Sequence, residues 1–209
     1  MERLVARGAE ADIYLGKWGP LEAIYKVRTP KQYMIDELDK RLRRHRTARE
    51  AKMLRAARIA VNTPHVLYVS LSRYIIVMEY INGKRMLDMI DEDPTMGRVI
   101  GEMLGRLHAH DIIHGDPNTA NFIFDYRRNK WYLVDFGLSF ISSRNEDKAV
   151  DLHLVKEVMY VQHPARFGEI MNAFYEGYKS ISEKNEEIIK KIDEIERRGR
   201  YARSRSFLF

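Results

Sequence analysis

The chain has 209 residues, of which 45% are hydrophobic and 32% charged, a composition that suits one globular domain or two closely packed lobes. It contains no cysteine, which excludes a disulfide framework and a thiolate metal site. The N-terminal stretch MERLVARGAEAD has no apolar core, and no run approaches about 18 apolar residues. We therefore expect neither a signal peptide nor a membrane span, and a cytoplasmic protein.

The net charge of +6 is unevenly distributed along the chain. Residues 40–58 hold nine Lys or Arg and one Glu, residues 197–209 hold five Arg and no acid, and the remainder sums to −7. Two basic segments on an acidic body suggest an anionic partner. The first segment is either a solvated helix face or a binding surface, and the second is either a contact with an anionic partner or a disordered end.

Short apolar runs dominate the first part of the chain. The segments RLVAR (3–7), ADIYLG (11–16) and EAIYKV (22–27) are separated by Gly and Pro and predict three antiparallel strands. Thr29 and Pro30 suit the N-cap and first position of a helix, which we expect over 29–59. The runs 65–71 and 74–81 predict a hairpin with Ser72 and Arg73 in its turn.

Helical periodicity takes over further along. The stretch 94–111 predicts a helix, and helices are also expected over about 147–162, 164–180 and 184–198. Between them, NFIFD (121–125) and KWYLVDFG (130–137) predict a hairpin around YRRN. The prediction is an α+β protein with a strand-rich lobe over 1–79 that includes one long helix, a helical lobe over 80–198, and a basic tail over 199–209.

The stretch IIHGDPNTANFIF (112–124) places an Asp and an Asn five residues apart in a loop before a strand. Asp116 and Asn121 are these residues, and Asp135 follows the next strand in LVDFG. We expect the three side chains to converge around one hairpin. Carboxylate and amide oxygens suit Mg²⁺, which keeps several waters and shares phosphate oxygens. An acid that is held back from the metal can orient an attacking hydroxyl.

HGDPNTAN together with DFG resembles the catalytic and metal loops of the protein-kinase superfamily, H-R-D-x-x-x-x-N and D-F-G. The resemblance implies ATP and Mg²⁺ as cofactors, Asp116 as the group that orients the acceptor, and Asn121 and Asp135 as metal ligands. Gly115 stands where that superfamily usually has an Arg, which often ties the loop to a phosphorylated activation segment. We therefore expect no switch of that kind.

Other kinase elements follow from further matches. EAIYKV resembles the strand V-A-I-K, which makes Lys26 the residue that positions the phosphates. Its partner should be an acid on the next helix, and Glu50 shares an inward face with Met53 and Leu54 at helical spacing. The predicted catalytic set is therefore Asp116, Lys26 and Glu50.

The nucleotide-covering loop and the hinge are matched less completely. RGAEADIY retains one Gly of the G-x-G-x-x-G pattern, and its loop consists of Gly8, Ala9, Glu10 and Ala11. VMEYINGK resembles the hinge, whose backbone at Glu79 and Tyr80 would bind adenine.

The combination of GAEA, RxxREAKML, LHAHDIIHGDPNTANF, DFGLSFISSRNEDKAVDLHLVKEV and RRGRYARSRSFLF resembles the small atypical kinase subunit of the archaeal KEOPS complex. The similarity covers nearly the whole chain. It implies a truncated two-lobed kinase fold and an atypical Ser/Thr kinase or ATPase. It also implies a sugar-kinase-like subunit and further KEOPS subunits as partners in forming threonylcarbamoyladenosine in tRNA. The Arg-rich tail would contact that tRNA.

Three alternatives remain for the function. A Rio-type kinase also has an HGD loop, but its metal acid usually lies outside a DFG. A small-molecule phosphotransferase needs a larger helical lobe than the 72 residues after Gly137 supply. A non-catalytic nucleotide-binding scaffold has no need of a complete set of Lys26, Glu50, Asp116, Asn121 and Asp135.

Two local assignments also stay open. His108, His110 and His114 could form a zinc set, although their spacing lacks a fourth ligand. Asp151 is either a buried acid that hydrogen-bonds the catalytic loop or a helix N-cap on the surface.

Overall fold

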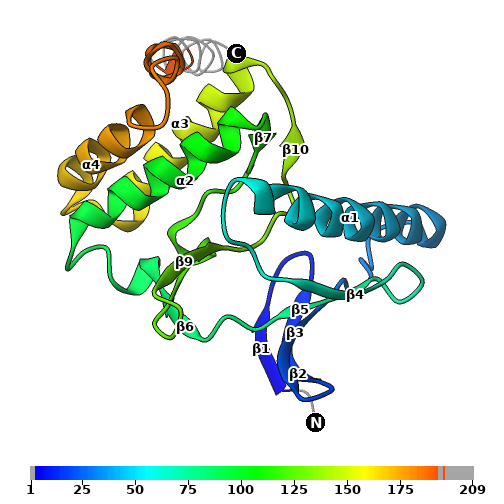
Figure 1. Cartoon of the computed structure of the whole chain (residues 1–209). Helices are drawn as coiled ribbons and strands as arrows, with labels where there is room; N and C mark the ends of the chain where they lie inside the picture. The colour runs from blue at the N-terminus through cyan, green and yellow to red at the C-terminus, as the bar shows by residue number, and fades with distance from the viewer. Residues whose placement is uncertain (1–2, 193–194, 196–209) are drawn as a thin grey trace. The chain divides into compact units, whose positions relative to one another are not determined.

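The computed structural model describes residues 3–192 and 195 (Figure 1). Its contacts divide the chain into two compact units. The first contains the residues up to Gly83 together with Ile123–Leu138, and the second contains Lys84–Phe122 together with the described residues from Ser139 onward. The first unit is built on sheets and one long helix and the second on helices, so the fold is α+β. The basic tail at 199–209 lies outside the described residues.

A five-stranded sheet in the order β1-β2-β3-β5-β4 forms the first unit, and each strand is antiparallel to its neighbours. The β2–β3 hairpin runs in register from Asp12 opposite Val27 to Trp18 opposite Leu21. Gly19 has φ +60° in its turn, a conformation that Gly adopts without strain. The five predicted strands are confirmed: β1 Arg3–Arg7, β2 Asp12–Trp18, β3 Leu21–Val27, β4 Val66–Ser70 and β5 Ile75–Glu79.

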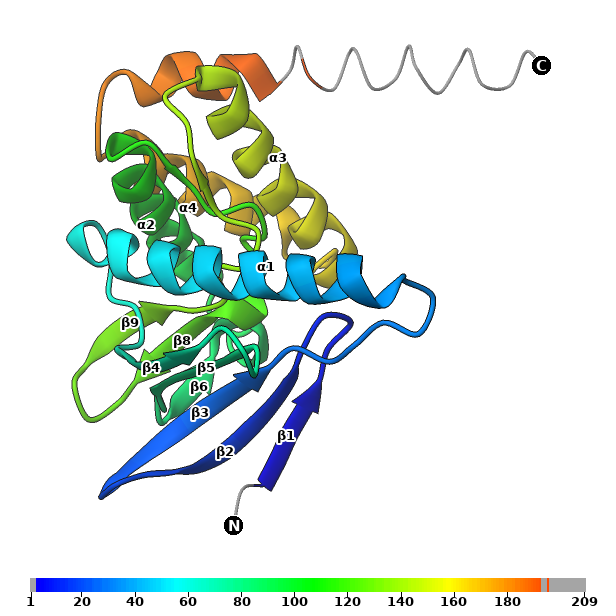
Figure 2. The same cartoon turned by 90° about the vertical axis from the view of Figure 1, so that its right-hand side faces the viewer.

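Helix α1 spans Asp36–Ala56 and packs against β4 and β5 (Figure 2). The prediction that it begins at Thr29 and Pro30 is wrong. Pro30 biases the residue before it toward extended backbone, and Lys31 N–H donates to Asp39 Oδ1 at 3.2 Å, which holds 31–34 in a turn. The helix starts instead where three acids can complement its N-terminal partial charge, namely Asp36, Glu37 and Asp39.

A second hairpin completes the first unit. Strands β8 (Phe122–Asp125) and β9 (Lys130–Leu133) pair around the turn YRRN, as the sequence predicts, and β6 (Gly83–Arg85) adds to β8 at the sheet edge. Asn129 takes φ +52° in the turn, which Asn tolerates better than most residues. Asp135 therefore follows closely after β9, a strand that is held in place by its pairing with β8.

The second unit consists of α2 (Gly97–Ala109), α3 (Asn145–Gln162), α4 (Phe167–Lys179) and a helical segment over 185–192. The first three confirm the predicted helices to within a few residues, and the described part of the fourth agrees with its predicted start, while the predicted end at 198 lies outside the described residues. A two-residue pairing of β7 (Ile112–Ile113) with β10 (Phe140–Ile141) joins the loops of this unit. None of the helices in the described part of the chain has the length and apolar character that crossing a bilayer requires.

Helices α2 and α4 approach each other closely because glycines line their contact. A Cβ added to Gly101 would lie 2.1 Å from Phe174 O, and one added to Gly177 would lie 2.1 Å from Arg98 O. Backbone atoms cannot yield as a flexible side chain can. The spacing of α2 and α4 is therefore set by residues without side chains. Because β7 follows α2 directly, this spacing also fixes where the β7 loop begins.

We expect Gly101→Ala to lower the free energy of unfolding by about 1–3 kcal/mol, the usual cost of overpacking. The matched control is Gly168→Ala in α4, where an added Cβ meets nothing within 4 Å and Ala raises helix propensity by up to about 1 kcal/mol. Urea denaturation of both variants measures the difference. Equal stability of the two would contradict the close-packed interface.

Candidate active site

Lys26 lies at the centre of a charged cluster within the first unit. Its Nζ is 2.6 Å from Glu50 Oε1 and 2.7 Å from Asp135 Oδ1. The three residues come from β3, from α1 and from the segment after β9. Lys26 is almost fully buried and Glu50 has no exposed surface, whereas 45% of the Asp135 side chain is exposed. The expected Lys–Glu ion pair therefore forms in a dry setting with one carboxylate open to solvent.

The two carboxylates keep Lys26 charged. Burial by itself lowers the pKa of Lys26, but the negative charges and hydrogen bonds of Glu50 and Asp135 outweigh it and raise the pKa above its ordinary value. An ammonium group has three N–H donors, and these two bonds use two of them. Lys26 is thus a fixed cation at neutral pH that can bind a further anionic oxygen.

Arg28 is a further member of this cluster and was not among the predicted site residues. It is buried, and its guanidinium donates to Glu50 Oε2 at 2.6 Å and to Glu10 Oε2 at 3.0 Å. Both oxygens of Glu50 are therefore occupied, one by Lys26 and one by Arg28. A signal was present in the sequence, because residues two apart at the end of a strand share a face, and Lys26 and Arg28 have this spacing.

The loop Gly8–Ala11 is tied down by its single acid. Gly8 N–H donates to Ala11 O at 2.9 Å across the turn, and Glu10 binds Arg28 and also Arg46 of α1. The predicted phosphate-covering loop thus joins the buried cluster through Glu10 instead of relying on a glycine-rich backbone. Its role in binding nucleotide stays a prediction.

Asp135 adopts a backbone conformation that most residues avoid. Its φ is +60°, and such values in non-Gly residues cost of order 1–3 kcal/mol and concentrate at functional sites. Gly137 N–H donates to Asp135 Oδ1 at 3.2 Å, and a Cβ on Gly137 would lie 3.1 Å from the same oxygen. The DFG sequence therefore supplies a local donor that aims the carboxylate and a Gly that leaves it room.

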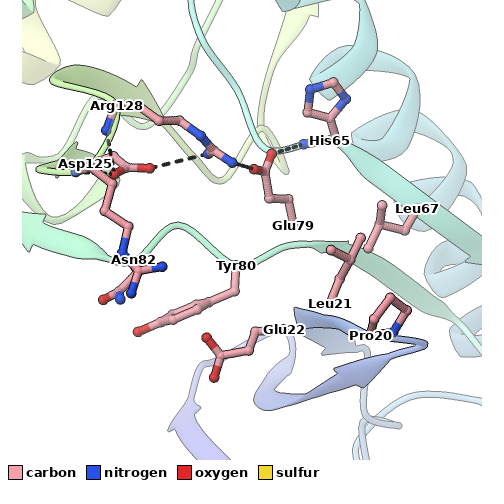
Figure 3. Close-up of a pocket in the computed structure, with 11 residues that line it drawn as sticks. Pro20, Leu21, Glu22, His65, Leu67, Glu79, Tyr80, Asn82, Asp125 and Arg128 are labelled. Atoms are coloured by element: carbon pink, nitrogen blue, oxygen red, sulfur yellow. Dashed lines mark hydrogen bonds and ion pairs between the residues drawn. The ribbon is translucent and has the colours of Figure 1, made fainter.

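The predicted hinge residues border a cavity of about 550 Å³ in the first unit (Figure 3). Figure 3 shows the Glu79 side chain pointing toward Arg128, whose Nη2 lies 2.6 Å from Glu79 Oε1. Glu79 N–H donates to His65 O at 2.8 Å and Tyr80 N–H to Glu22 O at 3.4 Å. Because both amide groups are engaged, the prediction that this backbone binds adenine rests on carbonyl oxygens.

In the second unit, the loop after β7 brings Asp116 and Asn121 together. Asn121 Nδ2 donates to Asp116 O at 3.0 Å, and Asn118 N–H donates to the same oxygen at 2.8 Å. The carbonyl acceptor fixes the amide orientation, since only the NH₂ end can donate. Asn121 thereby presents its amide oxygen as the end that can bind a cation.

Asp151 of α3 anchors this loop, which confirms the buried-acid interpretation. Its two carboxylate oxygens accept the backbone N–H groups of His114 and Gly115, both at 2.8 Å, and Oδ2 also lies 3.1 Å from His108 Nε2. Burial by itself raises the pKa of Asp151, but the hydrogen bonds and charges around it lower the pKa below its ordinary value. Asp151 is therefore an ionised group with no exposed surface.

Gly115 has a physical reason to be glycine. Its φ is +81°, in the left-handed region that residues with a Cβ rarely adopt. This conformation turns two successive N–H groups toward Asp151.

The segment after DFG is held against the same loop by its own bonds. β10 pairs with β7, Ser139 Oγ donates to His114 O at 2.7 Å, and Ser142 N–H donates to Asp111 O at 2.8 Å. Ser139 is fully buried. These bonds fix the segment against the β7 loop, and the expectation that no phosphorylation switch acts on it stays a prediction.

Of the three candidate zinc residues, His108 has other partners. His108 is buried between Asp151 and the hydroxyl of Tyr178, which lies 2.8 Å from His108 Nδ1. Burial, with the charge of Asp151, raises the pKa of Tyr178 well above its ordinary value, so Tyr178 stays a neutral partner. Among residues 3–192 and 195, no group of three or more His, Cys, Asp or Glu is arranged to hold a metal.

Comparison with known proteins defines the class. A family model described as the ABC1 atypical kinase-like domain matches residues 17–162. The fold resembles a crystal structure of the Rio2 kinase-ADP/Mg²⁺-phosphoaspartate complex from Chaetomium thermophilum, with a TM-score of 0.62 over 96% of this chain and 72% of that chain. The identity is 14%, so this likeness shows the fold alone. The molecule is an atypical kinase-like protein.

Curated relatives narrow the class to a family. The KEOPS complex subunit Bud32 of Pyrococcus abyssi is 40% identical over 99% of both chains, and the present chain belongs to this Bud32 family. A probable bifunctional tRNA threonylcarbamoyladenosine biosynthesis protein of Methanocaldococcus jannaschii is 41% identical over 96% of this chain. The chain spans 37% of the length of that bifunctional relative.

We expect Asp151→Asn to lower the free energy of unfolding at neutral pH by about 3 kcal/mol, since it leaves buried donors without an anionic acceptor. The folded-state pKa of Asp151 lies below its ordinary value of 3.8. Its contribution is therefore complete above that value and is lost as the pH falls through the folded-state pKa.

Denaturation measured from neutral pH to below pH 4 tests this account. As the pH falls through the folded-state pKa of Asp151, the free energy of unfolding should decrease less steeply for Asp151→Asn than for the wild type. The control is Glu157→Gln, on the same helix but with 56% of its side chain exposed. A variant whose stability falls as steeply with acid as that of the wild type would refute the assignment.

Proposed function

We propose that the chain is an ATP-dependent phosphotransferase, an atypical Ser/Thr protein kinase or ATPase that works in the KEOPS complex. The single observation that carries the proposal is the buried Lys26 ammonium, which binds Glu50 and the partly exposed Asp135 at once. A structural ion pair needs one carboxylate. The second one, open to solvent and held at a strained φ, is the feature of a site that exchanges partners when a ligand enters.

The residues present fit Mg-ATP. Magnesium prefers hard oxygen ligands and keeps several waters, and Asp135 and Asn121 offer a carboxylate and an amide oxygen. Lys26 has a third N–H donor for a phosphate oxygen. Bound Mg-ATP would supply the phosphoryl group and neutralise the charge that develops on transfer. We assign Asn121 and Asp135 to the metal and the loop Gly8–Ala11 to the nucleotide.

The remaining roles belong to residues that position and orient. Glu50, with both oxygens occupied, fixes Lys26. Asp116 orients the attacking hydroxyl of a Ser or of water, and its loop is held by Asp151 through two backbone bonds. Phosphoryl transfer requires little covalent chemistry from the protein, so this positioning and the fixed charges carry the rate.

The names of the relatives support the biological assignment. One is a KEOPS subunit, and others are called bifunctional tRNA threonylcarbamoyladenosine biosynthesis proteins. We propose that this chain acts in the same tRNA modification, in the cytoplasm, beside a sugar-kinase-like subunit and further KEOPS subunits. The Arg-rich tail remains a proposed tRNA contact.

Asp116→Asn should abolish phosphoryl transfer and spare ATP binding, because Asp116 acts on the acceptor and not on the nucleotide. Transfer of radiolabelled phosphate from ATP and calorimetric ATP titration are measured on the same samples. A variant that keeps more than a tenth of the wild-type rate, a barrier change under about 1.4 kcal/mol, would reject the role. Absence of turnover in the wild type, alone and with its partner subunit, would favour the non-catalytic scaffold.

Asp135→Ala should remove the Mg²⁺ dependence of ATP affinity. The metal would lose its only carboxylate ligand in the proposed set, while Lys26 and Glu50 remain paired. ATP is titrated with and without Mg²⁺ for the wild type and the variant. The control is Glu176→Ala, an exposed acid of α4. Equal Mg²⁺-dependent affinity in wild type and Asp135→Ala would eliminate the metal assignment.

A further inference from the structure

The outer side of α1 carries a row of cations. At about 100° per residue, Arg41, Arg44, Lys52 and Arg55 fall on one narrow side of the helix, opposite Glu50. All four are exposed, and none has an ion pair or side-chain hydrogen bond with another described residue. We call these four residues the α1 stripe.

Two inward-facing cations of the same helix, unlike those of the stripe, are paired with acids. Arg43 is 2.6 Å from Asp39, and Arg46 is paired with Glu10. Glu37 lies one turn before Arg41 on the outer face, but no ion pair joins these two described residues. The two inward-facing cations are thus paired with acids, whereas the positive charges of the stripe have no acidic partner among the described residues. The residues outside 40–58 and 197–209 nevertheless carry a net charge of −7.

The chemistry of the stripe favours a phosphate backbone over other anionic partners. Protein interfaces have an apolar centre, and the middle of the stripe is the small, exposed Ala48. Insertion into a membrane needs a free apolar helix face, but here that face is buried with Met53 and Leu54 in the core. Three of the four cations are Arg, whose planar fork binds phosphate oxygens in pairs.

The geometry agrees with an extended polyanion. With a rise of about 1.5 Å per residue, Arg41 and Arg55 are separated by about 21 Å along the axis. The cations form two pairs, one toward each end, with Ala48 between them. A rigid rod with this spacing can follow several successive phosphates, and the absence of bulk at Ala48 allows the nucleic acid backbone to approach the helix closely.

We propose that the α1 stripe is a docking surface for the phosphate backbone of tRNA. The inference rests on the proposed function for the identity of the nucleic acid, and adds a contact surface within the first unit to the tail. Binding there is independent of sequence, because backbone contacts position a protein without reading bases.

The test replaces the four cations by Gln, a good helix former that keeps the fold of α1. A matched control replaces four exposed cations elsewhere on the chain whose side chains also have no described partner. These are Lys17, Arg73, Lys84 and Lys130. Full-length wild type, stripe variant and control are titrated with an unmodified tRNA transcript by fluorescence anisotropy at several salt concentrations. ATP turnover and thermal unfolding are measured on the same samples.

The stripe variant should bind tRNA more weakly than the control. Its slope of log affinity against log salt should flatten by about 0.7–0.9 for each phosphate that is no longer neutralised, or about 3 in all. ATP turnover and unfolding should match the wild type. A slope unchanged from that of the wild type, or flattened equally in the control, overturns the proposal. So does a stripe variant that keeps tRNA affinity but no longer binds its partner subunit, which would make the stripe a protein contact.

Failure of the function and failure of the surface give different results. If the wild type binds tRNA through the stripe but shows no ATP turnover, the phosphotransferase assignment fails while the surface stands. If turnover is normal and the stripe has no effect on the salt slope, the surface fails while the enzyme stands.

Discussion

The first unit depends on one fully buried carboxylate. Glu50 has no exposed surface, so its charge requires partners for both oxygens, and Lys26 and Arg28 provide them at 2.6 Å each. Removing one partner of such a buried pair typically costs about 3–5 kcal/mol, because the other charge is left uncompensated. The requirement fixes the rotation of α1 against β3, and through Arg28 and Glu10 it also fixes the loop between β1 and β2. A single charge thus connects three elements that are distant in sequence.

The second unit also contains a buried carboxylate, but backbone N–H groups supply much of its stabilisation. Asp151 is as fully buried as Glu50, but two of its bonds come from the consecutive amides of His114 and Gly115. Such bonds specify the path of the main chain and not only the direction of a side chain. This explains why a Gly at φ +81° follows His114, and why Asp116 enters its loop from a fixed position. His108, which contacts Asp151, is hydrogen-bonded on its other side to the Tyr178 hydroxyl. Because this hydroxyl stays neutral, it adds no second negative charge near Asp151.

The sequence predicted most of this architecture because its signals are local. Strand-length apolar runs, the helical faces and the HGDxxxxN spacing each depend on residues close in the chain. Glu50 followed from the resemblance of EAIYKV to the kinase strand, which requires an acid on the next helix, together with helical periodicity. The errors arose where tertiary bonds override local preference. Thr29 and Pro30 are a good helix start by propensity, yet the carboxylate of Asp39 captures the amide of Lys31 and delays the helix to Asp36. The spacing of Lys26 and Arg28 places both on one face, but the partners of Arg28, Glu50 and Glu10, are distant in sequence and are brought to it only by tertiary packing.

Helix α1 shows how one periodicity serves two requirements. Because 3.6 residues complete a turn, Glu50 can lie at the centre of an inward face while cations seven or more residues apart align on the outer face. Inward charges must be matched, since burial penalises any imbalance. Outward charges are solvated and can remain unmatched at little cost to stability. A sequence that needs only stability has no reason to concentrate four cations on the solvated side of one helix, when the residues outside 40–58 and 197–209 carry a net charge of −7. The proposed docking surface accounts for this asymmetry between the two faces of α1, which the stability of the fold does not require.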